Sequence, residues 1–178
     1  ITGNNTTSTY DSTEHTATGY IASSEDALFK AENVSYEGTA LTSRTEAGRS
    51  QMELAVERFS YSDRNISATF ELSADGYVQI NRANFTVEEI ENRVYNGEEQ
   101  KVAPVVKDGE KTLIEGADYT VTYTEDLTNV GTVTVTVTGI GNYEGVKTEE
   151  YEITAHSLTI TITGNNTTST YDSTEHTA

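Results

Sequence analysis

The chain of 178 residues contains no cysteine, no tryptophan and only one proline. Without cysteine, disulfide bonds, zinc–thiolate sites and thiol catalysis are excluded. A single proline also excludes a proline-rich stalk. Because tryptophan is absent, a hydrophobic core has to be built mainly from valine, isoleucine, leucine and some of the eleven tyrosines.

Basic residues are scarce, with 11 lysines and arginines against 29 acidic residues and a formal net charge of −18. This balance argues against a general nucleic-acid binder, which needs a basic face to meet phosphates, and against docking on anionic lipid. We interpret the acidity as a source of solubility that keeps neighbouring molecules apart. No run of about 18 apolar residues occurs, so we predict no membrane insertion.

What the sequence does contain is an identical repeat at its two ends. Residues 1–17 and 162–178 both read ITGNNTTSTYDSTEHTA, a shift of 161 positions. A single compact domain has no use for such a copy, whereas a tandem array produces it directly. We therefore expect one full period of an array plus the opening of the next copy, with both ends lying inside a longer polypeptide.

A weaker repeat of about half that length lies inside the period. Three landmarks recur in the same order, pairing Tyr10-Asp11 with Tyr95-Asn96, Gly48 with Gly131, and Phe70 with Tyr151. The sequence therefore predicts two diverged modules, at residues 1–82 and 83–161, followed by the first strand of a third module at residues 162–178.

The secondary-structure signal is β almost throughout. Val133, Val135 and Val137 alternate with threonines, as expected for a strand with one buried and one solvated face. Similar alternation predicts further strands at residues 119–123, 52–56 and 158–162. The pair Asp108-Gly109 predicts a tight hairpin, and residues 24–29 and 87–90 are each as consistent with one short helical turn as with a loop.

The fold class that follows is all-β. We expect two small β-sandwich modules of Ig-like architecture joined end to end, with a β-grasp-like arrangement as the alternative. Modules of about 80 residues bury small cores, so bracing by neighbouring copies would help to stabilise each one.

The stretch from Thr9 to Tyr20 resembles the opening of the MBG-type repeat modules of large bacterial surface proteins. The phrases Tyr95-Asn96-Gly97, residues 118–123 and Gly141-Asn142-Tyr143 resemble a related module of secreted proteins from anaerobic Firmicutes. The resemblance implies an all-β extracellular module that occurs in tandem arrays of Gram-positive cell-surface proteins and adhesins, between a signal sequence and a wall anchor. It implies no catalytic residues and no cofactor.

Residues with reactive side chains give no pattern of an active site. The histidines His15, His156 and His176 lie in threonine-rich or junction segments, and serines are too common to single out a triad. We therefore expect no enzyme activity. Acidic pairs such as Glu98-Glu99 and Glu125-Asp126 are candidate ligands of a calcium site between modules. Lys101 and Lys107 are the candidates for a covalent cross-link to another side chain.

Two sets of side chains are candidates for modification or ligand binding. Asn-x-Ser/Thr motifs mark glycosylation candidates at Asn4, Asn5, Asn33, Asn65 and Asn84. Tyrosines that would stack on sugars, if they share a surface, are Tyr20, Tyr36, Tyr61, Tyr77 and Tyr143, although half-buried packing is the more common role of a strand tyrosine.

The function that the sequence favours is mechanical. We expect an extracellular, wall-anchored stalk or fibre unit whose partners are adjacent copies in the same polypeptide. The alternatives are a fibre assembled from neighbouring chains and a ligand-binding adhesin that uses repetition for avidity towards a glycan or host protein.

Overall fold

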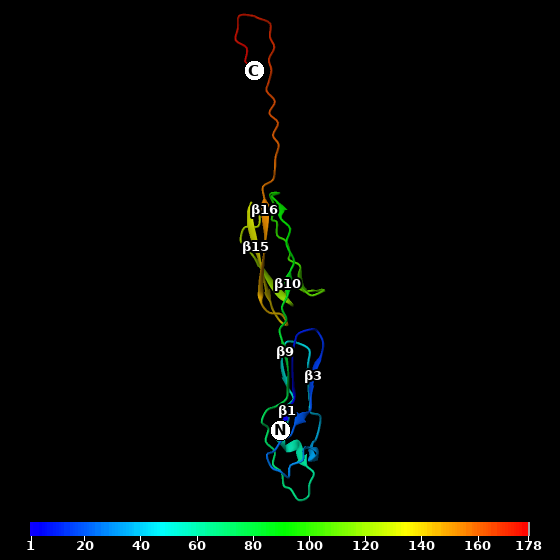
Figure 1. Ribbon diagram of the computed structural model, residues 1–178. Coiled ribbons are helices and arrows are strands. Elements are labelled where there is room, and N and C mark those ends of the chain that lie inside the picture. Colours follow the sequence, from blue (N-terminus) through cyan, green and yellow to red (C-terminus); the bar gives the residue numbers. More distant parts are fainter. Residues whose placement is uncertain (178) are drawn as a thin grey trace.

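The computed structural model describes residues 1–177, and they form an all-β protein, as predicted (Figure 1). Sixteen strands are joined by loops and two short 3₁₀ turns, η1 (Ala31–Asn33) and η2 (Val56–Arg58). No α-helix occurs in the described residues. They therefore contain no helix that is long and apolar enough to cross a bilayer. The finer Ig-like assignment stays a prediction.

The buried residues fall into two clusters, which define two units. The first unit contains the cluster from Ala17 to Ile80, and the second contains the cluster from Ala83 to Ile153. Every sheet takes its strands from one unit only. The strands of the first unit are β1 (Thr2–Gly3), β2 (Asn5–Thr9), β3 (His15–Thr18), β4 (Tyr20–Ile21), β5 (Val34–Tyr36), β6 (Leu41–Arg44), β7 (Gly48–Gln51), β8 (Phe59–Tyr61) and β9 (Tyr77–Asn81).

In the first unit the sheet β2-β9-β7 lies across the core from the pair β3-β6. Val78 and Ile80 from β9 and Ala17 from β3 are buried between them. The strand β2 pairs with β9 in parallel, whereas β7 pairs with β9 in antiparallel. The pairs β1-β4 and β5-β8 extend the unit towards its far end. There the core is aromatic, with Phe59 packed against three other rings.

The second unit is built around a four-stranded sheet. Its strands are β10 (Thr86–Val87), β11 (Arg93–Val94), β12 (Val106–Asp108), β13 (Lys111–Thr112), β14 (Tyr119–Tyr123), β15 (Gly131–Gly139) and β16 (Val146–Thr154). The sheet β11-β16-β15-β14 faces the smaller sheet β10-β12-β13. As in the first unit, an early strand, β11, pairs in parallel with the last strand, β16.

Alternation in the sequence predicted two strands of the second unit, β14 and β15, correctly. Val133, Val135 and Val137 in β15 are buried, while the threonines between them point to the more exposed face. The hairpin predicted at Asp108-Gly109 is also present, since Asp108 pairs with Lys111 and Gly109 has a φ of 55°. Glycine adopts this left-handed conformation without the Cβ clash that other residues suffer.

One local expectation is wrong, and two open alternatives are decided in favour of a loop. Neither residues 24–29 nor residues 87–90 form a helical turn. The strand expected at residues 52–56 is replaced by irregular chain that ends in η2. Here the Asp75 carboxylate accepts hydrogen bonds from the N–H groups of Glu53 and Leu54 at 2.9 and 3.1 Å, and Glu53 has a φ of 59°. Side-chain capping of this kind competes with strand pairing.

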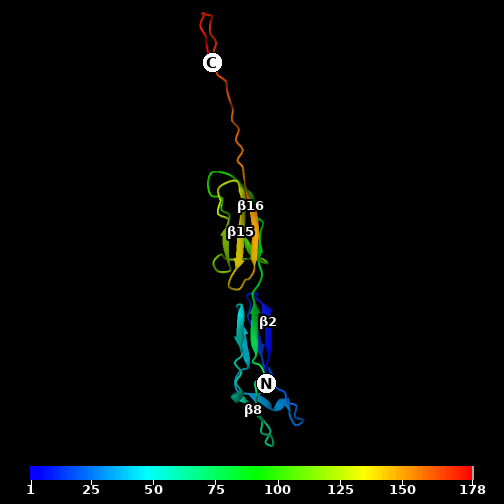
Figure 2. The same cartoon turned by 90° about the vertical axis from the view of Figure 1, so that its left-hand side faces the viewer.

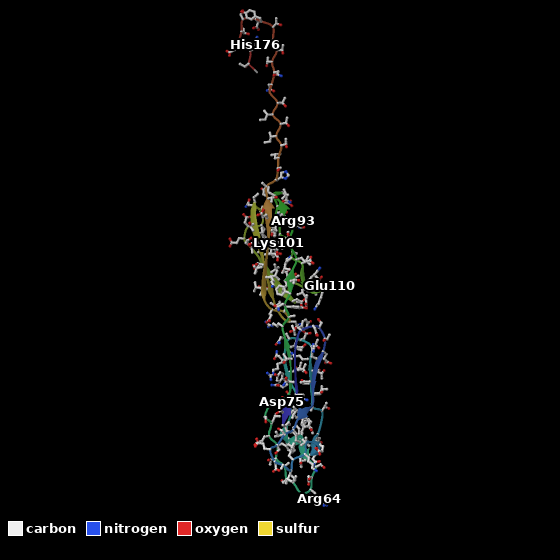
Figure 3. The ribbon with its side chains drawn as sticks, in the orientation of Figure 1. Arg64, Asp75, Arg93, Lys101, Glu110 and His176 are labelled. Atoms are coloured by element: carbon white, nitrogen blue, oxygen red, sulfur yellow. The ribbon has the colours of Figure 1, made fainter. Side chains whose placement is uncertain are left out.

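The two units lie end to end, and the chain leaves the second unit along the same direction (Figures 1 and 2). Residues 155–177 form an extended segment that bends back on itself at its end, and all of them are exposed. Figure 3 places Arg64 at the far pole of the first unit and His176 at the opposite extremity of the molecule. The strand expected at residues 158–162 is therefore extended but unpaired within the described chain.

The internal repeat predicted from the sequence has a structural counterpart in two of its three landmarks. The N–H of Tyr10 donates to the carbonyl of Asn81 at 2.9 Å, and that of Tyr95 donates to Thr154 at 2.8 Å. Gly48 and Gly131 each begin a strand that runs antiparallel to the last strand of its unit. The third landmark, Phe70 and Tyr151, is not structurally equivalent. Phe70 lies in irregular chain ahead of β9, whereas Tyr151 lies within β16.

Candidate functional site at the junction of the two units

The junction is a set of direct contacts between the first unit and the second. The ring of Tyr10 meets the ring of Tyr143 edge-on, with centroids 5.6 Å apart and planes at 83°. Tyr10 packs against the cores of both units, and Tyr143 is 0 % exposed. This edge-to-face arrangement is one of the preferred geometries of aromatic pairs. The junction therefore has a small hydrophobic core of its own.

Lys111 covers the polar side of this aromatic pair. Its Nζ donates to the Tyr143 hydroxyl at 3.2 Å and to the Ser12 Oγ at 3.5 Å, and it lies 5.5 Å from the centre of the Tyr10 ring. The Tyr143 hydroxyl donates in turn to the Asp108 carboxylate at 3.3 Å. The hydrogen bond to Tyr143 raises the pKa of Lys111, and burial raises the pKa of Tyr143. Both shifts favour a charged lysine beside a neutral phenol at neutral pH.

Asn142 makes the second contact across the junction. Its side-chain oxygen accepts a hydrogen bond from the N–H of Ala47 at 2.8 Å, and its Nδ2 donates to the carboxylate of Glu46. Its backbone carbonyl accepts from the N–H of Ala83 at 2.9 Å. One residue therefore ties together the β6–β7 turn, the connection between the units and the β15–β16 turn. These three hydrogen bonds fix the orientation of the two units relative to each other as well as the distance between them.

The loop that carries Tyr10 into the junction is fixed by its own hydrogen bonds. The Asp11 carboxylate accepts from the Thr13 N–H at 2.9 Å, from the Thr13 hydroxyl at 2.7 Å and contacts His15 Nε2 at 3.0 Å. Ser12 has a φ of 65°. This is an Asx turn, in which the side chain satisfies backbone two residues further on.

The free copy of this loop has the same geometry without any partner unit. Asp172 accepts from the Thr174 N–H at 3.0 Å and hydroxyl at 2.6 Å, and contacts His176 at 3.0 Å. Ser173 has a φ of 63°. The Thr167 hydroxyl donates to the Thr177 carbonyl, as Thr6 does to Thr16. The loop conformation is therefore encoded locally, and packing in the junction is not needed to form it.

These hydrogen bonds stabilise the ionised carboxylates. The Thr13 hydroxyl and N–H, with a smaller contribution from His15, lower the pKa of Asp11 from its ordinary 3.8 to about 2. The corresponding bonds from Thr174 lower the pKa of Asp172. At neutral pH both aspartates are charged acceptors, which is the state that the turn requires.

The five candidate tyrosines do not share one surface. Tyr20 and Tyr36 pack on Phe59 in the first core, and Tyr143 lies fully buried in the junction, so its ring has no free face for a sugar. Tyr61 stacks on Phe29, and Tyr77 lies under the Arg49 guanidinium, 3.5 Å from the ring centre. Sugar stacking at Tyr61 and Tyr77 stays a prediction.

The candidate glycosylation sites differ in accessibility. Asn5, Asn65 and Asn84 are exposed, whereas Asn4 and Asn33 are half-buried. The Nδ2 of Asn4 donates to the carbonyl of Thr18 at 2.8 Å, and this bond would have to break for modification. Modification at the three exposed sites stays a prediction.

The other candidates for chemistry lie apart. Lys107 pairs with Glu88, and Lys101 lies 4.7 Å from the Tyr123 ring centre. Asp126 accepts bonds from Thr128 and Asn129 within its own loop. No group of three or more histidine, aspartate or glutamate side chains in residues 1–177 is arranged to hold a metal ion.

Comparison of the chain with protein-family models, with curated proteins and with solved structures gives no match. The resemblance to MBG-type modules therefore stays a prediction. Sequence reasoning did not identify Tyr10, Lys111 or Asn142 as junction residues. The only clue in the sequence was the position of these residues. Tyr10 lies in the repeated segment, and Asn142 and Tyr143 follow a Gly-Ile-Gly turn.

Proposed function

We propose that this chain is a structural repeat unit of an extracellular stalk or fibre on a bacterial surface, which projects a functional tip from the cell. The exact repeat of residues 1–17 and the sequence resemblance support a tandem, surface-exposed array. The fold supports a mechanical role, because the units follow one another along one axis (Figure 1).

The observation that carries the proposal is the parallel pairing of the early and last strands in each unit. Residues 5–9 pair in register with residues 77–81, and Arg93-Val94 pair with Ile153-Thr154. In a parallel pair, the entry of the first strand and the exit of the last strand lie at opposite ends. Tension on the chain therefore shears all hydrogen bonds of the pair together instead of opening them one at a time.

The junction supports the same role. Tyr10, Lys111 and Asn142 connect the two units through side-chain contacts as well as through the covalent chain. A stalk needs such connections, because projection depends on stiffness between units as well as within them.

Two measurements test the proposal. Small-angle scattering of three consecutive periods should give a rod whose maximum dimension grows by a constant length with each period, and a compact particle would contradict it. In single-molecule pulling, force applied through the chain ends should unfold the first unit at a higher force than force applied at Thr9 and Asn81. These residues pair at one end of β2-β9, so pulling there opens the bonds in sequence. Equal forces would count against a mechanical design.

A further inference from the structure

A groove of about 490 Å³ lies at the far end of the first unit, directly ahead of Ile1. One wall contains residues 22–24 and Asp26, which follow β4, and the other contains residues 67–71 and Ser73. Between the walls lie apolar side chains that include Phe29, Val34 and Ile66.

The two walls lie on either side of the direction in which β1 would continue beyond Ile1. On one side, Thr2 pairs antiparallel with Ile21. On the other side, the Ile1 nitrogen donates to the Glu71 carbonyl at 2.8 Å and the Ser73 N–H donates to the Ile1 carbonyl at 2.8 Å, which is a parallel pattern. The groove therefore continues a strand position that Ile1 already occupies.

On the wall formed by residues 67–73, most of the backbone along this position is unpaired. In the described chain, the two bonds to Ile1 are the only backbone hydrogen bonds made by residues 67–73. Unpaired backbone along a strand edge is a template for another strand. The missing strand would have one neighbour on each side and the apolar side chains beneath it.

The sequence contains a segment whose pattern matches the groove. Leu158, Ile160 and Ile162 alternate with polar residues and are 75 %, 75 % and 90 % exposed. Ile162 is the copy of Ile1, which packs against the first core. Because side chains alternate along a strand, residues two and four places ahead of Ile1 face the same side as Ile1. In a tandem array those residues are Ile160 and Leu158.

We propose that residues 158–161 of one repeat period fill this groove in the following period and complete its first strand. The proposal rests on the tandem arrangement put forward above. By extension of the two registers, Ile160 lies between Ser24 and Phe70, and Leu158 lies between Asp26 and Ala68. The Ile160 N–H donates to the Thr69 carbonyl, and the Glu71 N–H donates to the Ile160 carbonyl.

The assignment changes the nature of the connection between periods. With residues 158–161 bound in the groove, only residues 155–157 remain between β16 and the next unit, a span of roughly 10 Å when extended. The apparent free tail of one period is then a structural strand of the next, and the joint between periods becomes short.

The test uses the full chain lengthened at Ile1 by a copy of residues 156–161. Amide hydrogen exchange at Glu71 should slow by at least about tenfold relative to the 178-residue chain, because its N–H gains an acceptor. Replacing the added leucine and isoleucine by serine should remove that protection. Replacing the two added threonines, which face away from the groove, by serine should leave it in place.

Unchanged exchange at Glu71 in the lengthened chain would overturn the proposal. Protection that appears only with concentration, together with oligomers in sedimentation, would assign the groove to a separate chain and would also overturn it. The result is distinguishable from failure of the stalk proposal. A three-period rod without Glu71 protection removes the groove assignment alone, and a compact three-period particle with protection removes the stalk alone.

Discussion

The Tyr10 and Tyr143 rings meet edge-on with centroids 5.6 Å apart, and they belong to different units with separate cores. Their contact joins a residue of the repeated segment to the second unit. The same tyrosine occurs again as Tyr171, where it is 89 % exposed. The molecule therefore contains a buried and a free version of one residue, which makes a matched comparison possible.

Tyr10→Ala should lower the free energy of unfolding by about 1–3 kcal/mol, because a half-buried ring and its aromatic partner contact are lost. Tyr171→Ala should change it by less than about 0.5 kcal/mol. Urea unfolding of both variants provides the comparison. Equal effects would show that Tyr10 acts through the loop itself and not through the junction.

Asn142→Ala should loosen the orientation of the units. It removes the acceptor of the Ala47 N–H and the donor to Glu46, a cost of about 1–3 kcal/mol for a partly buried backbone group left unpaired. Residual dipolar couplings should fit a single alignment tensor in the wild type and two in the variant. Asn84→Ala, at an exposed position near the same turn, is the control and should behave as wild type. A single tensor in both variants would contradict the assignment.

Gly3→Ala should destabilise the first unit strongly, and Gly164→Ala should not. A Cβ at Gly3 would lie 2.1 Å from the backbone nitrogen of Gly76, whereas a Cβ at Gly164, its copy, meets no atom of the described chain within 4 Å. Overpacking of this kind costs about 1–3 kcal/mol or more, against less than about 0.5 kcal/mol at an exposed site. Thermal unfolding distinguishes them, and similar melting temperatures would disprove the tight approach of β1 to Gly76.

Acid should open the Asp11 turn only at low pH. A carboxylate with a lowered pKa stabilises the folded turn fully above its ordinary value of 3.8, and this stabilisation is lost as the pH falls towards about 2. Carbon-detected NMR titration should place the Asp11 midpoint below 3.8. Thr13→Ala should raise that midpoint and leave Asp172 unchanged, whereas Thr174→Ala should do the reverse. An Asp11 midpoint at the ordinary 3.8 in the wild type would show that the hydrogen bonds of the turn do not lower its pKa.

The sequence was most informative where one strand face is buried and the other is solvated. Val133, Val135 and Val137 lie in the predicted register because burial of one face permits only one pairing of faces. The Asp108-Gly109 hairpin was predictable for a similarly local reason, the tolerance of glycine for positive φ.

Non-local pairings could not be predicted in the same way. The strand β2 is a run of asparagine, threonine and serine whose faces are equally polar, so its parallel partner β9 leaves no mark on its own sequence. Met52 and Leu54 suggested a strand, yet the Asp75 carboxylate, 21 residues beyond Leu54, diverts the backbone there. Asn142 is a polar turn residue by composition, and its role depends on where the other unit lies.

The second unit also separates two identical strand sequences. Residues 5–9 pair with β9, and residues 166–170, which have the same sequence, lie at the opposite extremity of the molecule (Figure 1). Identical neighbouring sequences are the usual substrate of domain swapping and misassembly. Because the second unit lies between them, the two copies of this strand sequence are kept apart within one chain, and each unit retains its own β2.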